Sequence, residues 1–214
     1  MIKQIFFIWL QGATHIPEKM QENIEFVKEQ NLDYVVRIID LELFELFLKD
    51  KPLYLSTYFN KLNKKCHAMI ADFMRIVLLY YEGGVYLDVK TKPKKPLRDF
   101  IKEDKSYVFY VDIWSEYCNH FLVCKKGCEL YMHLIQEICA GIDDYKYDVS
   151  AKTKDIVVTL TGPKLLTKLV STYNYNDLIK MQGSLTKKYI QYSCVKYHHK
   201  HYASYTKFKE PLIL

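Results

Sequence analysis

The pattern of apolar and polar residues predicts alternating strands and helices. Residues 5–10 are continuously apolar and β-prone, which is typical of a strand covered on both faces. Pro17 lies near the first turn of a predicted helix that runs to about Gln30, and residues 33–39 form the next predicted strand. A strand, a helix and a strand in this order form a βαβ unit, which opens many nucleotide-binding α/β folds.

Residues 71–90 are the most informative stretch. They continue a helix that begins near Lys65 and is apolar on nearly every side. Gly83 and Gly84 end it, because glycine accepts the left-handed backbone that closes a last turn. Residues 85–87 then form a short buried strand. Asp88 follows at the carboxyl end of this strand, where open α/β sheets usually bind their ligands.

Two charged residues interrupt this apolar helix. Asp72 and Arg75 are three positions apart and therefore share one helical face. A helix that is apolar all round is buried, so both side chains need partners. Two interpretations stay open from the residues alone. The pair is either a buried ion pair that only fixes packing, or it points toward a polar ligand held near Asp88.

The remaining elements are predicted from shorter patterns. We expect helices at 41–48 and 53–62, a helix that ends near Ala140, and a helix after Thr161-Gly162-Pro163. Further strands are predicted at 107–111, 119–124 and 189–195, with loops at 91–96 and 141–154. The Thr-Gly-Pro segment is either a simple turn or a helix start that faces an anion. Together these elements predict one α/β domain over residues 1–214.

The motif around the double glycine resembles a known family. Ala-Asp-x-x-Arg followed by Gly-Gly-Val-Tyr-Leu-Asp is similar to the core of the DXD-containing sugar transferases, which include fungal Golgi mannosyltransferases and the glucosyltransferase domains of large clostridial toxins. Their usual pattern is Ser-Asp-x-x-Arg, then Gly-Gly-x-Tyr-x-Asp-x-Asp. Ala71 replaces the serine, and Lys90 replaces the second aspartate. The resemblance implies a GT-A-like fold with a mixed, mostly parallel sheet flanked by helices.

The resemblance also implies an activity and its residues. It implies transfer of a hexose from a nucleotide-sugar donor, either a UDP- or a GDP-sugar, with retention of anomeric configuration. The acceptor stays open between a glycan, a protein and a small molecule. Trp9 would stack on the base, although a core aromatic is the alternative. The implied donor-binding residues are Trp9, Asp72, Arg75, Gly84, Tyr86, Asp88 and Ser204.

Lys90 leaves the role of a metal open, because an ammonium group cannot bind a cation. In one interpretation Lys90 replaces the charge of the metal and contacts the diphosphate, so Asp88 and Lys90 carry the chemistry. In a second, Mn²⁺ or another divalent cation still binds through Asp88 and His199. Three histidines lie at 198–201, a pattern that suits a transition metal or a His-rich tail. In the third, the site is impaired and the protein is a binding module.

Composition limits which ligands, partners and compartments we expect for this protein. The net charge of +6 over 214 residues suits an anionic ligand. The lysines are scattered apart from the run at 92–95, so we do not expect nucleic-acid binding. The six cysteines contain no Cys-x-x-Cys pair, and the N-terminal apolar run is too short for a signal peptide or a membrane span. We expect reduced cysteines and a cytoplasmic protein without an integral membrane segment.

Overall fold

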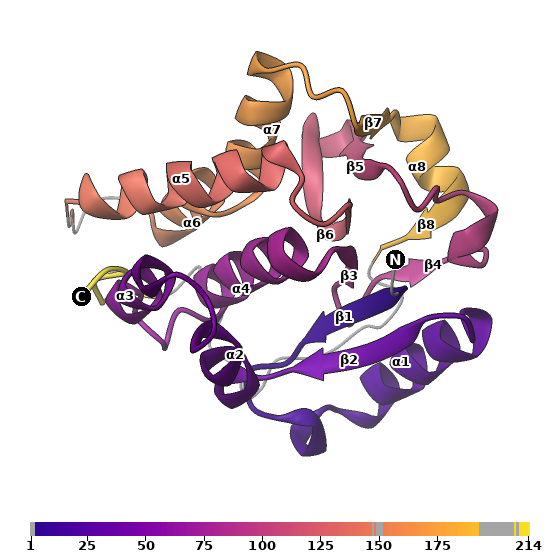
Figure 1. Cartoon of the computed structure of the whole chain (residues 1–214), viewed down its shortest axis with the longest axis horizontal. Helices are drawn as coiled ribbons and strands as arrows, with labels where there is room; N and C mark the ends of the chain where they lie inside the picture. Colours follow the sequence, from indigo (N-terminus) through magenta and orange to yellow (C-terminus); the bar gives the residue numbers. More distant parts are fainter. Residues whose placement is uncertain (1–2, 147, 149–151, 193–207, 209) are drawn as a thin grey trace.

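The structure is a computed structural model that describes residues 3–146, 148, 152–192, 208 and 210–214. Its centre is a six-stranded sheet in the order β2-β1-β3-β6-β5-β7, with helices on both faces (Figure 1). The strands are β1 (Gln4–Ile8), β2 (Val35–Ile39), β3 (Gly84–Leu87), β5 (Ser106–Val111), β6 (Glu116–Cys124) and β7 (Leu178–Met181). Only β6 runs antiparallel to its neighbours β3 and β5, and the other three pairings are parallel. The predicted mixed, mostly parallel sheet is therefore confirmed.

Eight α-helices and a small second sheet complete the described part of the chain. The helices are α1 (Glu18–Gln30), α2 (Leu41–Leu48), α3 (Leu53–Lys61), α4 (His67–Glu82), α5 (Glu129–Asp143), α6 (Thr153–Leu160), α7 (Pro163–Thr172) and α8 (Gly183–Tyr189). Strands β4 (Lys92–Pro93) and β8 (Ile190–Gln191) pair with each other as the second sheet. Short 3-10 helices lie at Ala13–His15, Leu97–Asp99 and Asp112–Trp114.

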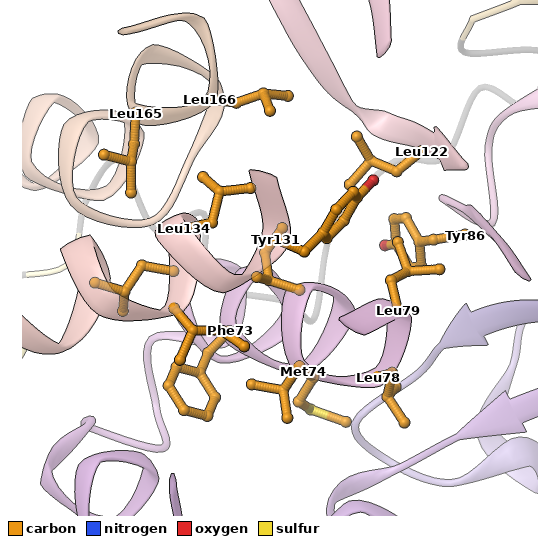
Figure 2. Close-up of a cluster of buried hydrophobic side chains, with 14 of the residues drawn as sticks. Phe73, Met74, Leu78, Leu79, Tyr86, Leu122, Tyr131, Leu134, Leu165 and Leu166 are labelled. Atoms are coloured by element: carbon orange, nitrogen blue, oxygen red, sulfur yellow. The ribbon is translucent and has the colours of Figure 1, made fainter. Parts of the chain in front are cut away.

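The alternation of side chains along β1 divides the core into two layers. Phe6 and Ile8 belong to the layer that contains α4, α5 and α7, whereas Ile5 and Phe7 belong to the layer that contains α1. All five residues of β1 are buried, as expected for a strand covered on both faces. Figure 2 shows the first layer, in which Phe73, Met74 and Leu78 of α4 lie near Tyr131 and Leu134 of α5.

Helix α4 contributes Asp72 and Arg75 to the site, and two glycines fix where it ends. Ten of its sixteen residues are buried, so it lies inside the α4-side layer. Gly83 ends the helix with a φ of 68°, and its N–H donates to the carbonyl of Leu79. Gly84 has a φ of 104°, and a Cβ there would lie 2.7 Å from the carbonyl oxygen of Gln4. Both glycines therefore let the chain turn from α4 directly into the central strand β3.

Parallel pairing brings the ends of three strands to one edge of the sheet. β1 pairs in parallel with both β2 and β3, so the chain leaves all three at the same edge. β2 continues into α2, whose first turn is capped by the side chain of Asp40. β3 continues into Asp88. We call this the carboxyl edge, and it is the expected place for a ligand in such a sheet.

Most predicted elements are confirmed, and the differences lie in the last third. The helices at 41–48 and 53–62 and the strand at 107–111 lie within one residue of α2, α3 and β5. The predicted strand at 189–195 is wrong at its start, because Tyr189 ends α8. Ile190–Gln191 pair as β8, and residues 193–195 lie outside the described part of the chain. The predicted loop at 141–154 contains the end of α5 and the start of α6, and β4 interrupts the loop at 91–96. The assignment of residues 1–214 to a single domain stays a prediction.

Among the described residues, no helix combines the length and the apolarity needed to cross a membrane. The compartment therefore stays a prediction.

Candidate functional site

Asp88 opens a turn at the carboxyl edge. Its side chain is 40% exposed, although it follows a fully buried strand. The N–H of Thr91 donates to the carbonyl of Asp88 at 2.8 Å, which closes a four-residue turn with Val89 and Lys90 at its corners. The buried Asn23 of α1 donates to the carbonyls of Val89 and Thr91, at 2.9 and 3.1 Å. Hydrogen bonds from α1 therefore fix the turn, and the Asp88 carboxylate is exposed to solvent.

Two α4-side groups hold the Asp88 carboxylate. The hydroxyl of Tyr86 donates to Oδ1 of Asp88 at 2.5 Å, and Nη1 of Arg75 lies 3.5 Å from the same oxygen. The Arg75 guanidinium also lies over the Tyr86 ring, 4.4 Å from its centroid. Burial raises the pKa of Tyr86 well above its ordinary value, so the phenol keeps the proton that it donates. Asp88 is therefore oriented before any ligand arrives.

Arg75 is fixed at every nitrogen. Nε donates to the carbonyl of Ala71 at 3.1 Å, Nη1 donates to the carbonyl of Asn119 at 2.6 Å, and Nη2 lies 3.4 Å from Oδ1 of Asp72. Burial alone would lower the pKa of this guanidinium, but Tyr86, Asp72 and Asp88 raise it, so it is charged. Its side chain is only 8% exposed. Arg75 therefore links a buried carboxylate to an exposed one.

Asp72 is the buried end of a series of three charged side chains, Asp72, Arg75 and Asp88. Asn119 of β6 donates to its Oδ1 at 2.6 Å, and the Thr161 hydroxyl donates to its Oδ2 at 3.1 Å. Burial raises the pKa of Asp72 to about 7, against the lowering effects of Arg75 and of these two hydrogen bonds. The first interpretation of the Asp72–Arg75 pair is confirmed, and contact with a ligand near Asp88 stays a prediction. The pair is a buried ion pair, and through Arg75 it also reaches the exposed Asp88.

Trp9 ends the strand next to Asp88. β1 and β3 pair with Ile5 opposite Val85 and Phe6 opposite Tyr86, so the same register sets Ile8 level with Asp88. Trp9 begins one residue further along, at the carboxyl edge. Its indole packs against the α1-side layer, whereas Asp88 is bonded to Tyr86 of the α4-side layer. The two side chains therefore flank the carboxyl edge from opposite faces of the sheet, and stacking on a base stays a prediction.

The described residues do not fit the metal site that a DXD motif implies. Among them, no group of three or more His, Cys, Asp or Glu side chains is arranged to hold a metal ion. Oδ1 of Asp88 is already shared by Tyr86 and Arg75. Lys90 stands in place of the second aspartate of the motif, and its ammonium group has three hydrogen-bond donors and no lone pair for a cation.

One predicted site residue, Gly84, is not brought to Asp88, and two others lie outside the described residues. Gly84 lies at the opposite end of β3, where it makes room for the backbone of Gln4, and its predicted contact with the donor stays a prediction. His199 and Ser204 lie outside the described residues, so their predicted contacts with a metal and a diphosphate stay predictions.

Sequence reasoning missed two residues that position the site and only weakly indicated a third. The roles of Asn23 and Thr161 depend on tertiary contacts, because Asn23 holds the 88–91 turn from α1 and Thr161 reaches Asp72 across 89 residues. Asn119, together with His120, is indicated by the family resemblance as part of a polar patch that faces the sugar. It supplies both a donor to Asp72 and an acceptor for Arg75.

Comparisons with known proteins agree with this geometry. The family model described as "Glycosyltransferase sugar-binding region containing DXD motif" matches residues 17–107, which include α4, β3 and Asp88. An uncharacterized glycosyltransferase of Acanthamoeba polyphaga mimivirus is 24% identical over 187 residues, covering 86% of this chain and 70% of that protein.

Two solved toxin structures share the fold. The PaToxG glycosyltransferase matches with a TM-score of 0.58 and 18% identity, over 78% of this chain and 67% of that one. The UDP-bound glycosyltransferase domain of the YGT toxin matches with a TM-score of 0.56 and 11% identity, over 84% of this chain and 79% of that one. The predicted GT-A-like fold class is thereby confirmed. Residues 17–107 thus match the model of the DXD-containing glycosyltransferase family, with Lys90 in place of the second aspartate of the motif.

Proposed function

We propose that this protein transfers a hexose from a nucleotide-sugar donor to an acceptor hydroxyl. One observation carries the proposal. A buried carboxylate, a buried guanidinium and a part-exposed carboxylate form a continuous chain, Asp72–Arg75–Asp88, that ends at the carboxyl edge of a glycosyltransferase sheet. Such pre-oriented charge suits a ligand rich in hydroxyl groups and phosphates.

Asp88 is the residue that we expect to touch the donor. Its carboxylate is held by Tyr86 and Arg75 on one oxygen, while 40% of the side chain is exposed. A carboxylate oxygen accepts hydrogen bonds from the ribose or sugar hydroxyl groups of the donor. We propose that Trp9, one residue beyond the level of Asp88 on β1, stacks on the base. Stacking of this kind contributes roughly 1–3 kcal/mol per base.

Asp72 is better explained as a positioning residue than as a donor contact. Its side chain is 6% exposed, and both of its oxygens accept hydrogen bonds from protein groups. It therefore acts on the donor through Arg75. This proposal replaces the direct contact with sugar hydroxyl groups that the family resemblance implied for Asp72.

Lys90 is proposed to stabilise the leaving diphosphate. During transfer a bond forms between the acceptor oxygen and the anomeric carbon, and the bond from that carbon to the diphosphate oxygen breaks. The bonding electron pair leaves with the diphosphate, which also takes the hydroxyl proton. Stabilising this growing negative charge is the main catalytic requirement. Lys90 lies two residues from Asp88 in the same turn, so its ammonium can supply positive charge where relatives place a metal-binding aspartate.

A UDP-sugar is the first donor to test. The support is limited to the fold, because the YGT toxin domain with the same architecture was solved with UDP bound. A GDP-sugar and retention of configuration remain part of the proposal through the family resemblance. The purified protein should be incubated with UDP-glucose, UDP-N-acetylglucosamine, UDP-galactose and GDP-mannose, and the released nucleotide should be measured. Release that Asp88→Asn abolishes would support the proposal.

The second candidate is a nucleotide-sugar-binding module without turnover. It is favoured by one observation, the replacement of the second motif aspartate by Lys90. Calorimetry with the same donors separates the two candidates. Binding without nucleotide release would favour the module, and no binding by any donor would contradict both candidates.

A further inference from the structure

A concave feature lies on the β5 side of the sheet. It is a cavity of about 270 Å³ between the end of β5 and the α8–β8 segment, with Tyr110, Asp112, Ile113, Gly183 and Tyr192 among its lining residues. This volume lies just below the roughly 300–1,000 Å³ of pockets for drug-sized ligands, which suits one small ring more than an extended chain.

Tyr192 of the cavity wall belongs to a cluster of three aromatic side chains with Trp114 and His120. The His120 ring lies 4.3 Å from the Tyr192 ring, and the Trp114 ring lies 6.2 Å from each of them. Nε2 of His120 and the hydroxyl oxygen of Tyr192 are both buried, and among the described residues neither has a hydrogen-bond partner. Buried polar groups without partners are rare and costly, and here two of them lie side by side.

The cluster is directly connected to the candidate active site. The N–H of Asp88 donates to the carbonyl of His120 at 2.9 Å, so the two residues are neighbours on adjacent strands. β8, which immediately precedes Tyr192, pairs with β4, which follows the 88–91 turn. The cluster therefore adjoins, through His120, the residue whose carboxylate we expect to hold the donor.

The side chains in and beside the cavity favour a neutral ligand with hydroxyl groups. Asp112 and Lys187 offset each other's charge at 3.3 Å, and the Lys94 ammonium donates to the carbonyl of Lys187 at 2.7 Å. A hydroxyl group can donate to His120 Nε2 and accept from Tyr192 Oη at the same time. Trp114 is 54% exposed and offers a large aromatic surface that an apolar ring face can cover.

We infer that this cavity, together with the Trp114–His120–Tyr192 cluster that adjoins it through Tyr192, is the acceptor subsite and that its occupant is a sugar ring. The inference rests on the proposed function, because it assigns the acceptor of the same reaction. It selects a glycan acceptor over a protein side chain and over a charged small molecule. The hydroxyl group that reaches past His120 toward Asp88 is the one that would receive the hexose.

Direct binding tests this assignment without any need for turnover. Saturation-transfer NMR should be recorded on the full chain with methyl glycosides of glucose, galactose, mannose and N-acetylglucosamine. At least one glycoside should show saturation transfer in the wild type, and Trp114→Ala should weaken its binding at least tenfold. Tyr192→Phe removes only the hydroxyl group, and we expect it to weaken binding about threefold to tenfold, which corresponds to about one hydrogen bond.

The controls separate this inference from the proposed function. Tyr173→Ala removes another half-exposed aromatic residue, 49% exposed at the end of α7, and should leave glycoside binding unchanged. UDP binding by calorimetry should be the same in wild type and Trp114→Ala. If Trp114→Ala instead abolishes UDP binding, the cavity belongs to the donor and the inference is wrong. Absence of any Trp114-dependent glycoside binding would also overturn the inference. If the wild type does not bind UDP at all, the result counts against the proposed function instead.

Discussion

Thr161→Val perturbs the Asp72–Arg75–Asp88 series at its buried end, and the new side chain has almost the same shape as the old one. Thr161 is 3% exposed, and its hydroxyl donates to Asp72 Oδ2 at 3.1 Å. The alternative acceptor, the carbonyl of Val157, also receives the helical N–H of Thr161 and keeps that partner in the variant. The substitution therefore leaves the Asp72 carboxylate without this donor. Hydrogen bonds to charged groups contribute about 1.5–3 kcal/mol, and we expect a loss of that size in the free energy of unfolding at pH 7.5.

Urea unfolding followed by circular dichroism measures this loss, and thermal unfolding gives a second estimate. For a chain of this length, each kcal/mol shifts the Tm by roughly 2–4 °C, so the Tm should fall by about 3–12 °C. Thr161→Ser is the control, because it keeps the hydroxyl group and loses only the methyl group. A double-mutant cycle with Asp72→Asn should return a coupling of about 1.5–3 kcal/mol. Equal losses for the valine and serine variants, or an undiminished loss in the Asp72→Asn background, would refute the reasoning.

Three further predictions test other parts of the account. Lys90→Asp restores the DXD pattern, so donor turnover should become dependent on Mn²⁺, whereas a chelator should change wild-type turnover less than twofold; Mn²⁺-dependent wild-type turnover would contradict this. Gly84→Ala should cost at least about 3 kcal/mol in urea unfolding, because both its φ of 104° and the 2.7 Å approach to Gln4 oppose a side chain. Gly127→Ala, with a φ of 74° and open space, should cost only about 1–2 kcal/mol, and equal costs would count against the close approach. Stability should fall as pH rises from about 4 to about 7, because the folded state, with the pKa of Asp72 raised to about 7, holds this proton more tightly than the unfolded state; Asp72→Asn should remove that component, and an unchanged profile would contradict the assignment.

The motif segment was predictable because its signals are local. An apolar run, two glycines and a β-prone tripeptide specify α4, β3 and the position of Asp88 without reference to the rest of the chain. α6 and α8 were missed for the opposite reason. α6 reads TKDIVVTL, in which β-branched residues oppose a helical prediction, and α8 has only seven residues.

The contacts within the site were less predictable than its motif. The spacing of Asp72 and Arg75 predicted that they share a face, and the structure confirms their ion pair. The sequence does not indicate that Thr161 completes the Asp72 site or that Asn23 holds the turn beneath Lys90. Each of these contacts joins segments at least 66 residues apart, so it depends on how the layers pack.

Donor binding to wild type and Asp88→Asn tests the central claim most directly. Isothermal titration calorimetry with UDP-glucose and GDP-mannose should show saturable binding of at least one donor to the wild type. Asp88→Asn should weaken it at least tenfold, and Asp104→Asn, an exposed aspartate in the turn before β5, should leave it unchanged. Unchanged affinity in Asp88→Asn would contradict the claim that the carboxylate at the carboxyl edge holds the donor.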